Sequence, residues 1–275
     1  MIDLHSHILP GIDDGSKSLE MSLAMARIAV DDGITIMACT PHIYPGLYMN
    51  DKAGITAARD ALQTSLDGHG IALKLTTGAD VHLVPGLLEG LRAGTVPSLN
   101  NTRYVLLEPS HHVAPPRFAE SVFQLVSAGY VPVITHPERL TWIEDHFQVF
   151  VDLTRQGAWM QVTAGALTGV FGARAKYWGE RFVGEGLTHI LATDAHSSGR
   201  RVPVLSEAKK VAERLLGPQE ALLLVEGRQT AILNNLPSAE VPSLPSHIRP
   251  DRGWWRQLIT KRSYLASHSL SNFLK

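Results

Sequence analysis

Ile2-Asp3-Leu4-His5-Ser6-His7 opens the chain and places two histidines directly after a short apolar run. Residues 2–4 are predicted to form a short strand, so His5 and His7 follow at its carboxyl end. Side chains at positions i and i+2 of a strand point to the same face, so the two imidazoles share a face. The stretch therefore predicts a strand that delivers a pair of imidazoles to one site, and their partners should lie at the ends of other strands.

Continuous apolar runs rich in β-branched residues recur along the chain and predict six further strands, at residues 34–40, 72–77, 104–107, 131–135, 159–162 and 188–193. Helical patterns separate or follow them, at 19–32, 56–66, 87–91, 118–128, 147–156, 173–184, 206–216 and 220–233. Strands that are apolar throughout, rather than alternating, are typical of parallel sheets. Seven strand–helix repeats fit a closed α/β barrel or an open doubly wound sheet.

Six of the seven predicted strands end on an imidazole or a carboxylate. In α/β barrels, the carboxyl ends of the strands meet at one rim, and the active site lies there. Structural histidines that arose independently have no reason to follow successive strands in this way, so the pattern favours a barrel with one shared site. The strand-end residues are His5 and His7, then His42, Asp80, Glu108 and His136, and finally Asp194 and His196.

Imidazole and carboxylate side chains together are typical ligands of manganese, iron or zinc, whereas an all-oxygen set would favour magnesium or calcium. Asp14 adds a further carboxylate to the set. At about four to five ligands per ion, with some carboxylates bridging, the candidates fit two or three divalent ions. The predicted metal ligands are His5, His7, Asp14, His42, Asp80, Glu108, His136, Asp194 and His196.

The composition excludes several other classes of protein. The 275 residues have a formal net charge of -1, which gives no overall electrostatic footprint for nucleic acid. A single cysteine, Cys39, excludes an intramolecular disulfide and any multi-cysteine metal site, and it fits a reducing compartment. We find neither a signal peptide at the start nor an apolar run of the roughly 20 residues that span a bilayer, so we expect a cytoplasmic protein that is not transmembrane.

The composition changes from Pro237 onward, where prolines become frequent. We therefore predict a compact domain over residues 1–236 and a Pro-rich linker with a basic, aromatic extension over 237–275. Trp254 and Trp255 lie among arginines and lysines there, as in segments that contact membrane surfaces, so peripheral contact with a membrane or a partner is one interpretation. A loosely ordered extension is the alternative.

The opening block, from Ile2 to the Asp13-Asp14-Gly15 turn, resembles the first motif of the PHP (polymerase and histidinol phosphatase) superfamily. More narrowly, it resembles the bacterial manganese-dependent protein-tyrosine phosphatases of capsular and exopolysaccharide operons. The Asp-Asp-Gly and His-Pro-Glu-Arg blocks distinguish this branch from histidinol phosphatases and polymerase-associated domains. Further matching blocks follow in order up to about residue 201: Thr40-Pro41-His42, Leu107-Glu108, Thr135-His136-Pro137-Glu138-Arg139 and Thr193-Asp194-Ala195-His196.

The resemblance implies a distorted seven-stranded (β/α) barrel of the PHP type with a trinuclear metal centre at the carboxyl ends of the strands. In this family the residue at the third strand end is a glutamate that bridges two ions, whereas this chain has Asp80. Aspartate reaches about 1.5 Å less far, since it lacks one methylene. His82 is a possible substitute, although we expect it at the rim. By the resemblance, His5, His7 and Asp194 hold one ion, Glu108 and His136 a second, and Asp14, His42 and His196 the third, with Asp80 between the first two.

The activity that the resemblance implies is hydrolysis of a phosphomonoester, most specifically phosphotyrosine, by a hydroxide that bridges the metal ions, without a covalent intermediate. Arg139 and Arg201 are the candidates for binding the phosphate, because a planar guanidinium binds two phosphate oxygens at once. Arg200 is the alternative to Arg201, and His111 or His112 could donate a proton to the leaving group. The implied partner is a phosphotyrosine protein, namely a membrane-associated tyrosine autokinase of polysaccharide export.

Other functions stay open at this point. Cys39 is not a credible phosphatase nucleophile, since it lies in an apolar strand and Pro45 stands where a Cys-x5-Arg loop needs its arginine. A metal-dependent amidohydrolase also uses a His-x-His pair on its first strand, although it has a lysine or equivalent bridging group at strand four, where this chain has Glu108. A histidinol-phosphatase-like or other small-molecule phosphoesterase, and a catalytically weak phosphoprotein-binding module, are the remaining alternatives.

Overall fold

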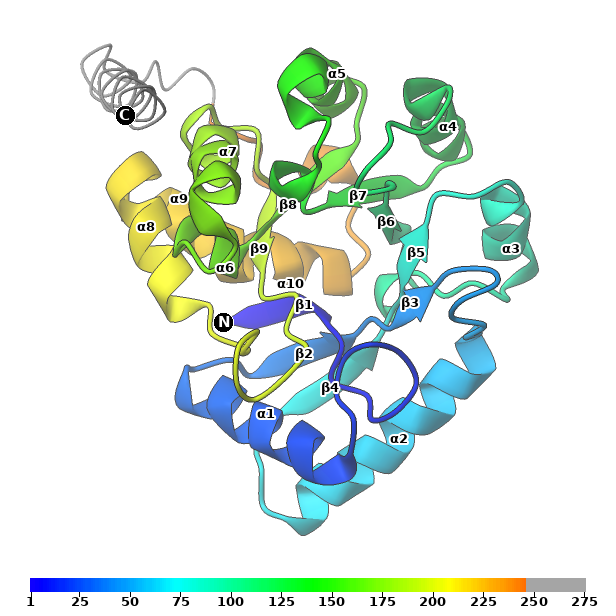
Figure 1. The fold of residues 1–275 in the computed structure, drawn as a ribbon, viewed down its shortest axis with the longest axis vertical. Helices are drawn as coiled ribbons and strands as arrows, with labels where there is room; N and C mark the ends of the chain where they lie inside the picture. The colour runs from blue at the N-terminus through cyan, green and yellow to red at the C-terminus, as the bar shows by residue number, and fades with distance from the viewer. Residues whose placement is uncertain (246–275) are drawn as a thin grey trace, which may run out of the picture.

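The computed structural model describes residues 1–245, so the predicted tail contacts of Trp254 and Trp255 lie outside the described residues. Strands alternate with helices along the chain, and the helices surround the strands (Figure 1). The strands are β1 (Ile2–Ser6), β2 (Ile36–Cys39), β3 (His42–Ile43), β4 (Lys74–Thr77), β5 (Asp80–His82), β6 (Tyr104–Glu108), β7 (Val131–Thr135), β8 (Trp159–Thr163) and β9 (Ile190–Ala192).

Each of the eight predicted helices corresponds to a helical segment of the structure, although several bounds differ, and the short α6 was not predicted. For example, the predicted helix at 56–66 begins earlier, because the side chain of Asp51 caps it by accepting a hydrogen bond from the backbone N–H of Gly54. The predicted helix at 220–233 is divided by a π-helical turn, η3 (Leu223–Gly227). The α-helices are α1 (Leu19–Asp31), α2 (Lys52–Gly68), α3 (Leu87–Ala93), α4 (Phe118–Ser127), α5 (Ile143–Arg155), α6 (Ala164–Leu167), α7 (Gly172–Gly184), α8 (Ser206–Leu216), α9 (Pro218–Leu222) and α10 (Arg228–Leu233).

All strand pairs are parallel, as predicted, and they form two sheets with the orders β1-β2-β4 and β3-β5-β6-β7-β8-β9. The division arises because the strands predicted at 34–40 and 72–77 are each followed, after two residues, by a second short strand. Thr40-Pro41 separates β2 from β3, and Gly78-Ala79 separates β4 from β5. Proline has no N–H for a ladder hydrogen bond. A Cβ on Gly78 would lie 2.8 Å from Cδ2 of Leu99 and 3.0 Å from Cγ2 of Thr40, so a larger residue at the second break would require these side chains to shift.

The first and last strands meet at a seam. The backbone N–H of Asp194 donates to the carbonyl of His5 over 2.8 Å, and Ser6 forms a parallel bridge with Ala195. The carboxylate of Asp3 is fully buried at this seam and accepts hydrogen bonds from the backbone N–H and hydroxyl of Thr193. Burial raises the pKa of Asp3 to about 6. The seam therefore places the first predicted ligands, at the end of β1, beside the last ones, which follow β9.

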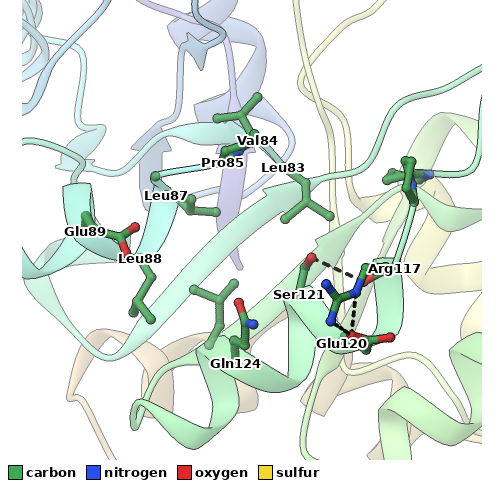
Figure 2. A pocket seen from close by; sticks show the side chains of 14 residues that line it. Leu83, Val84, Pro85, Leu87, Leu88, Glu89, Arg117, Glu120, Ser121 and Gln124 are labelled. Carbon is green, nitrogen blue, oxygen red and sulfur yellow. Dashed lines mark hydrogen bonds and ion pairs between the residues drawn. The ribbon is translucent and has the colours of Figure 1, made fainter.

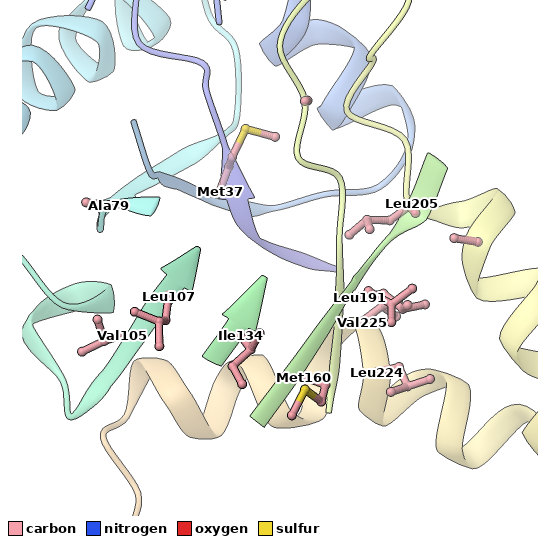
Figure 3. Close-up of a cluster of buried hydrophobic side chains, with 14 of the residues drawn as sticks. Met37, Ala79, Val105, Leu107, Ile134, Met160, Leu191, Leu205, Leu224 and Val225 are labelled. Atoms are coloured by element: carbon pink, nitrogen blue, oxygen red, sulfur yellow. The ribbon is translucent and has the colours of Figure 1, made fainter. Parts of the chain in front are cut away.

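Successive side chains along β6 to β9 point to opposite faces of the sheet, and the two faces have different roles. One face carries Val105, Leu107, Ile134 and Met160, which belong to a cluster of buried apolar side chains (Figure 3). On the other face, the amino halves of the strands are apolar and form a second cluster with α10, whereas the carboxyl halves are polar. On β6 this second face carries Tyr104, Leu106 and then Glu108.

Residues at the end of the described chain pack onto this body. The Arg228 side chain is fully buried, and its guanidinium donates to the carbonyls of Pro242 and Ser243. Val241 belongs to the cluster that contains Leu106. Among the residues that the structure describes, none of the helices combines the length and the apolar character needed to cross a bilayer.

Replacing Leu106 with alanine should lower the free energy of unfolding by about 2–5 kcal/mol, because the side chain is fully buried in the second cluster and a cavity would remain. Leu222→Ala is the control: Leu222 is 47% exposed, and its loss should cost under about 0.5 kcal/mol. Urea denaturation measures both. Equal effects would show that Leu106 is not a core residue.

Candidate metal centre

The nine predicted ligands form one cluster. Six of them lie at or just beyond the carboxyl ends of strands, whereas His42 and Asp80 begin β3 and β5, and Asp14 lies in the loop after β1. Nε2 of His5 lies 3.4 Å from a carboxylate oxygen of Asp80 and 3.4 Å from one of Asp194. Nε2 of His7 lies 3.3 Å from the same Asp194 oxygen and 3.3 Å from Nε2 of His5. Two donors bonded to one ion at about 2.1 Å lie roughly 3.0–3.4 Å apart, so this group has the spacing of a shared ion.

Two further groups adjoin the first. Nε2 of His136 lies 3.6 Å from Oε1 of Glu108. On the other side, Oδ1 of Asp14 lies 3.5 Å from Nε2 of His42 and 3.4 Å from Nε2 of His196. Asp14 is exposed at the mouth of the cluster, whereas His136 is buried. The three ligand sets that the family resemblance implies therefore lie in the structure as three neighbouring groups of side chains.

Asp80 lies where the groups meet. Its Oδ2 atom is 3.4 Å from Nε2 of His5, 3.5 Å from Nδ1 of His42 and 3.9 Å from Nε2 of His136. The side chain is fully buried, and Oδ2 has no hydrogen-bond partner. A buried carboxylate oxygen without a donor is costly unless a cation is beside it. The donor set and this unpartnered oxygen therefore fit divalent ions.

The backbone at two of these positions is strained. His136 and Asp194 follow β7 and β9 with φ values of 36° and 51°, in the left-handed region that non-glycine residues seldom adopt. Such conformations cost of order 1–3 kcal/mol and persist only where surrounding contacts hold them. Here they turn both side chains into the cluster at the point where the strands end.

The electrostatics keep the carboxylates ionised. Burial alone would raise the pKa of Asp194, but the Arg201 guanidinium, His5 and Arg139 hold it well below its usual range. Burial likewise opposes the charge on His42, yet the neighbouring Glu108 and Asp80 raise its pKa to about 10. The cluster thus attracts positive charge, whether from protons or from metal ions.

Two residues that the sequence interpretation missed orient the histidines. Nδ1 of His7 donates to Oδ2 of Asp13 over 2.7 Å, and Nδ1 of His5 donates to Oε1 of Gln161 over 3.0 Å. In both rings this directs Nε2 into the cluster. Two features of the sequence could have pointed to them: Asp13 directly precedes Asp14, and Gln161 lies near the carboxyl end of the sixth predicted strand.

Both predicted arginines face the cluster. Arg139 and Arg201 donate to the same oxygen of Asp194, and their guanidinium carbons lie 4.5 Å and 5.6 Å from the centre of the Phe171 ring. Arg200, the alternative, is exposed. Phe171 lies in the loop before α7, and nothing in the sequence pointed to it. The arrangement presents two guanidinium groups beside the predicted metal ligands, which suits an anionic phosphoryl group.

The other residues considered from the sequence lie as follows. His82 contacts Oε2 of Glu108 at 2.9 Å and stacks on Tyr44 with the ring centres 3.8 Å apart. His111 reaches the same carboxylate, whereas His112 is exposed. Cys39 is buried within β2, and burial raises the pKa of its thiol, so it is inert as a nucleophile.

A cavity of about 500 Å³ lies away from this chemistry (Figure 2). It is bounded by the segment 83–89 and by α4, and Arg117 pairs with Glu120 at its edge. None of the nine predicted ligands lines it. The predicted metal ligands therefore do not converge on this cavity.

Comparisons with known proteins agree with this geometry. The family described as "Capsular polysaccharide synthesis, CpsB/CapC" matches residues 1–234. Tyrosine-protein phosphatase YwqE of Bacillus subtilis is 37% identical over 236 residues, covering 85% of this chain and 92% of that protein. The putative tyrosine-protein phosphatase CapC of Staphylococcus aureus is 30% identical over 209 residues, covering 75% of this chain and 81% of that protein.

A solved structure gives the same result for the fold. It comes from work on YwqE of Bacillus subtilis and CpsB of Streptococcus pneumoniae, described as unique metal-dependent tyrosine phosphatases, and it superposes with a TM-score of 0.84 at 34% identity. The match covers 90% of this chain and 100% of that one. The family match spans all nine predicted metal ligands, and the fold match covers most of the chain. The chain therefore belongs to the CpsB/CapC family of capsular polysaccharide synthesis.

Proposed function

We propose that this chain is a metal-dependent protein-tyrosine phosphatase. The observation that supports this most is the buried, unpartnered oxygen of Asp80 among imidazoles of three ligand groups, with Arg139 and Arg201 beside them. The names of the relatives, tyrosine-protein phosphatases, support the same activity. Phosphotyrosine proteins are the substrate class.

The nine clustered side chains would hold two or three ions, with manganese as the favoured metal and iron or zinc as alternatives. His5, His7 and Asp194 would hold one ion, and Asp14, His42 and His196 another. Glu108 and His136 would hold the ion between them, with Asp80 shared. When bound, such ions act as Lewis acids and make a water-derived nucleophile available at neutral pH.

The protein's own groups would bind and orient the phosphate. Arg139 and Arg201 can each direct two N–H groups at phosphate oxygens, and the Phe171 ring beside them limits how far the guanidinium groups swing. A tyrosine leaving group has a pKa near 10, so it needs little help from an acid. Cys39 is buried and takes no part, which supports direct hydrolysis without a covalent intermediate.

We further propose that the two sheets are parts of one distorted seven-stranded barrel. β2 and β3 would count as one strand, as would β4 and β5, since backbone hydrogen bonds such as Gly78 N–H to the Cys39 carbonyl cross the breaks. The bridge between Ser6 and Ala195 supports closure between β1 and β9. Residues 1–236 would be the phosphatase domain, and 237–275 an extension.

We also propose the cellular setting that the family description favours. The partner would be a membrane-associated tyrosine autokinase of polysaccharide export, and the protein would be cytoplasmic. The family's role in capsular polysaccharide synthesis supports this setting. The C-terminal extension would provide any peripheral contact with the membrane or the partner.

Removing metal should abolish hydrolysis of a phosphotyrosine peptide, and added manganese should restore it, because the clustered ligands would hold the ions that activate water. Cys39→Ala should keep its activity in the same assay, since the thiol is buried away from the site. Elemental analysis should find two or three ions per chain. Full activity in chelator, or loss of activity in Cys39→Ala, would contradict the mechanism.

Arg201→Ala should lower kcat/KM for the phosphotyrosine peptide by about 10–100-fold, because a charge-assisted contact worth about 1.5–3 kcal/mol is removed. Arg200→Ala is the matched control and should stay within about twofold of the wild type, since its side chain is exposed. Steady-state kinetics measure both. The opposite order would mean that Arg200 binds the phosphate.

A further inference from the structure

The Glu108 carboxylate is contacted by more imidazoles than the family ligand set explains. Oε2 lies 3.3 Å from Nδ1 of His42 and 2.9 Å from Nδ1 of His82. Oε1 lies 3.6 Å from Nε2 of His136 and 3.2 Å from Nε2 of His111. His111 therefore contacts the same Glu108 oxygen, Oε1, as the predicted ligand His136.

The spacing of these atoms suits one ion. Ligand atoms of Glu108, His111 and His136 all lie within 4.8 Å of one another. The distance between His111 and Glu108, 3.2 Å, is close to the 3.4 Å between His5 and Asp194. Donors bonded to one ion at about 2.1 Å have this separation. The nitrogen of His111 is thus placed like those of the predicted ligands.

Of the three ligands that the resemblance assigns to the ion at Glu108, Asp80 is the one that is poorly placed. Oδ2 of Asp80 is 3.4 Å from Nε2 of His5 but 3.9 Å from Nε2 of His136, so it lies nearer to the first group. An aspartate is shorter than a glutamate by one methylene, about 1.5 Å. With only the ligands that the resemblance assigns to it, the ion at Glu108 and His136 would therefore depend on a distant carboxylate.

The backbone beside His111 is held in place. Its carbonyl accepts hydrogen bonds from the backbone N–H of Thr141 at 2.9 Å and from the Thr141 hydroxyl at 3.1 Å. Nε1 of Trp142 donates to the carbonyl of Ser110 over 2.8 Å. The side chain of His111 is 26% exposed, so it borders the mouth of the cluster. The loop after β6 is thereby anchored to the segment that follows His136.

We propose that Nε2 of His111 is a fourth protein ligand, beside Asp80, Glu108 and His136, and that it compensates for the short reach of Asp80. The assignment rests on the metal centre of the proposed function. It gives His111 a binding role, in place of proton donation to the leaving group.

Manganese titration by calorimetry, with elemental analysis after dialysis, tests the assignment on full-length protein. His111→Ala should either retain one ion fewer or bind its weakest ion at least about tenfold more weakly. His112→Ala is the matched control from the same loop and should bind manganese like the wild type, since it is exposed. His111→Gln keeps a hydrogen-bond donor but lacks the imidazole nitrogen, so it should behave like His111→Ala.

A second experiment tests whether His111 compensates for the short Asp80 side chain. In an Asp80→Glu background the longer carboxylate should reach the ion itself, so adding His111→Ala should weaken manganese binding less than about threefold. Unchanged ion number and affinity in His111→Ala, or full rescue by His111→Gln, would overturn the ligand assignment. An equal loss in both backgrounds would overturn the compensation. If the wild type itself binds no ions, the proposed function fails as well; if only His111→Ala is unaffected, the proposed function stands and this inference falls.

Discussion

Repulsion among buried carboxylates is the constraint on which the rest of the structure depends. Asp80, Glu108 and Asp194 are almost fully buried. They share imidazole neighbours: His5 contacts both Asp80 and Asp194, and His42 contacts Asp80, Glu108 and the more exposed Asp14. Burying such charges is very costly unless positive charge accompanies them. Imidazoles and two arginines supply part of that charge, and bound divalent ions would supply the rest. The same positive charge would attract a phosphate dianion. The groups that stabilise the buried carboxylates would therefore also bind the substrate.

The fold delivers these charges through the period of the β-strand. On the face that carries Leu106 and Glu108, the amino halves of the strands are apolar and the carboxyl halves polar, so one face serves both as core and as site. The seam held by Asp3 then places His5 beside Asp194. A cluster assembled from residues almost two hundred positions apart therefore depends on parallel strand pairing, on the strained turns at His136 and Asp194, and on the loop that carries Asp14.

Much of this could be predicted from the sequence, because apolar strands that end in His, Asp or Glu make a periodic signal. The nine ligand candidates lie together for that reason. The strands that begin at His42 and Asp80 were not predicted, since each has only two or three residues, too few for a periodic signal. Phe171 and the position of His111 were also beyond reach: both lie in loops, whose paths are set by tertiary contacts such as those of Thr141.

The most direct measurement of the central claim is anomalous diffraction at the manganese edge from crystals grown with Mn²⁺. The account predicts two or three strong peaks in the cluster, with at least one at a bonding distance of about 2.0–2.3 Å from the Asp80 carboxylate. Peaks confined to the protein surface, or a cluster without any peak at saturating Mn²⁺, would contradict it.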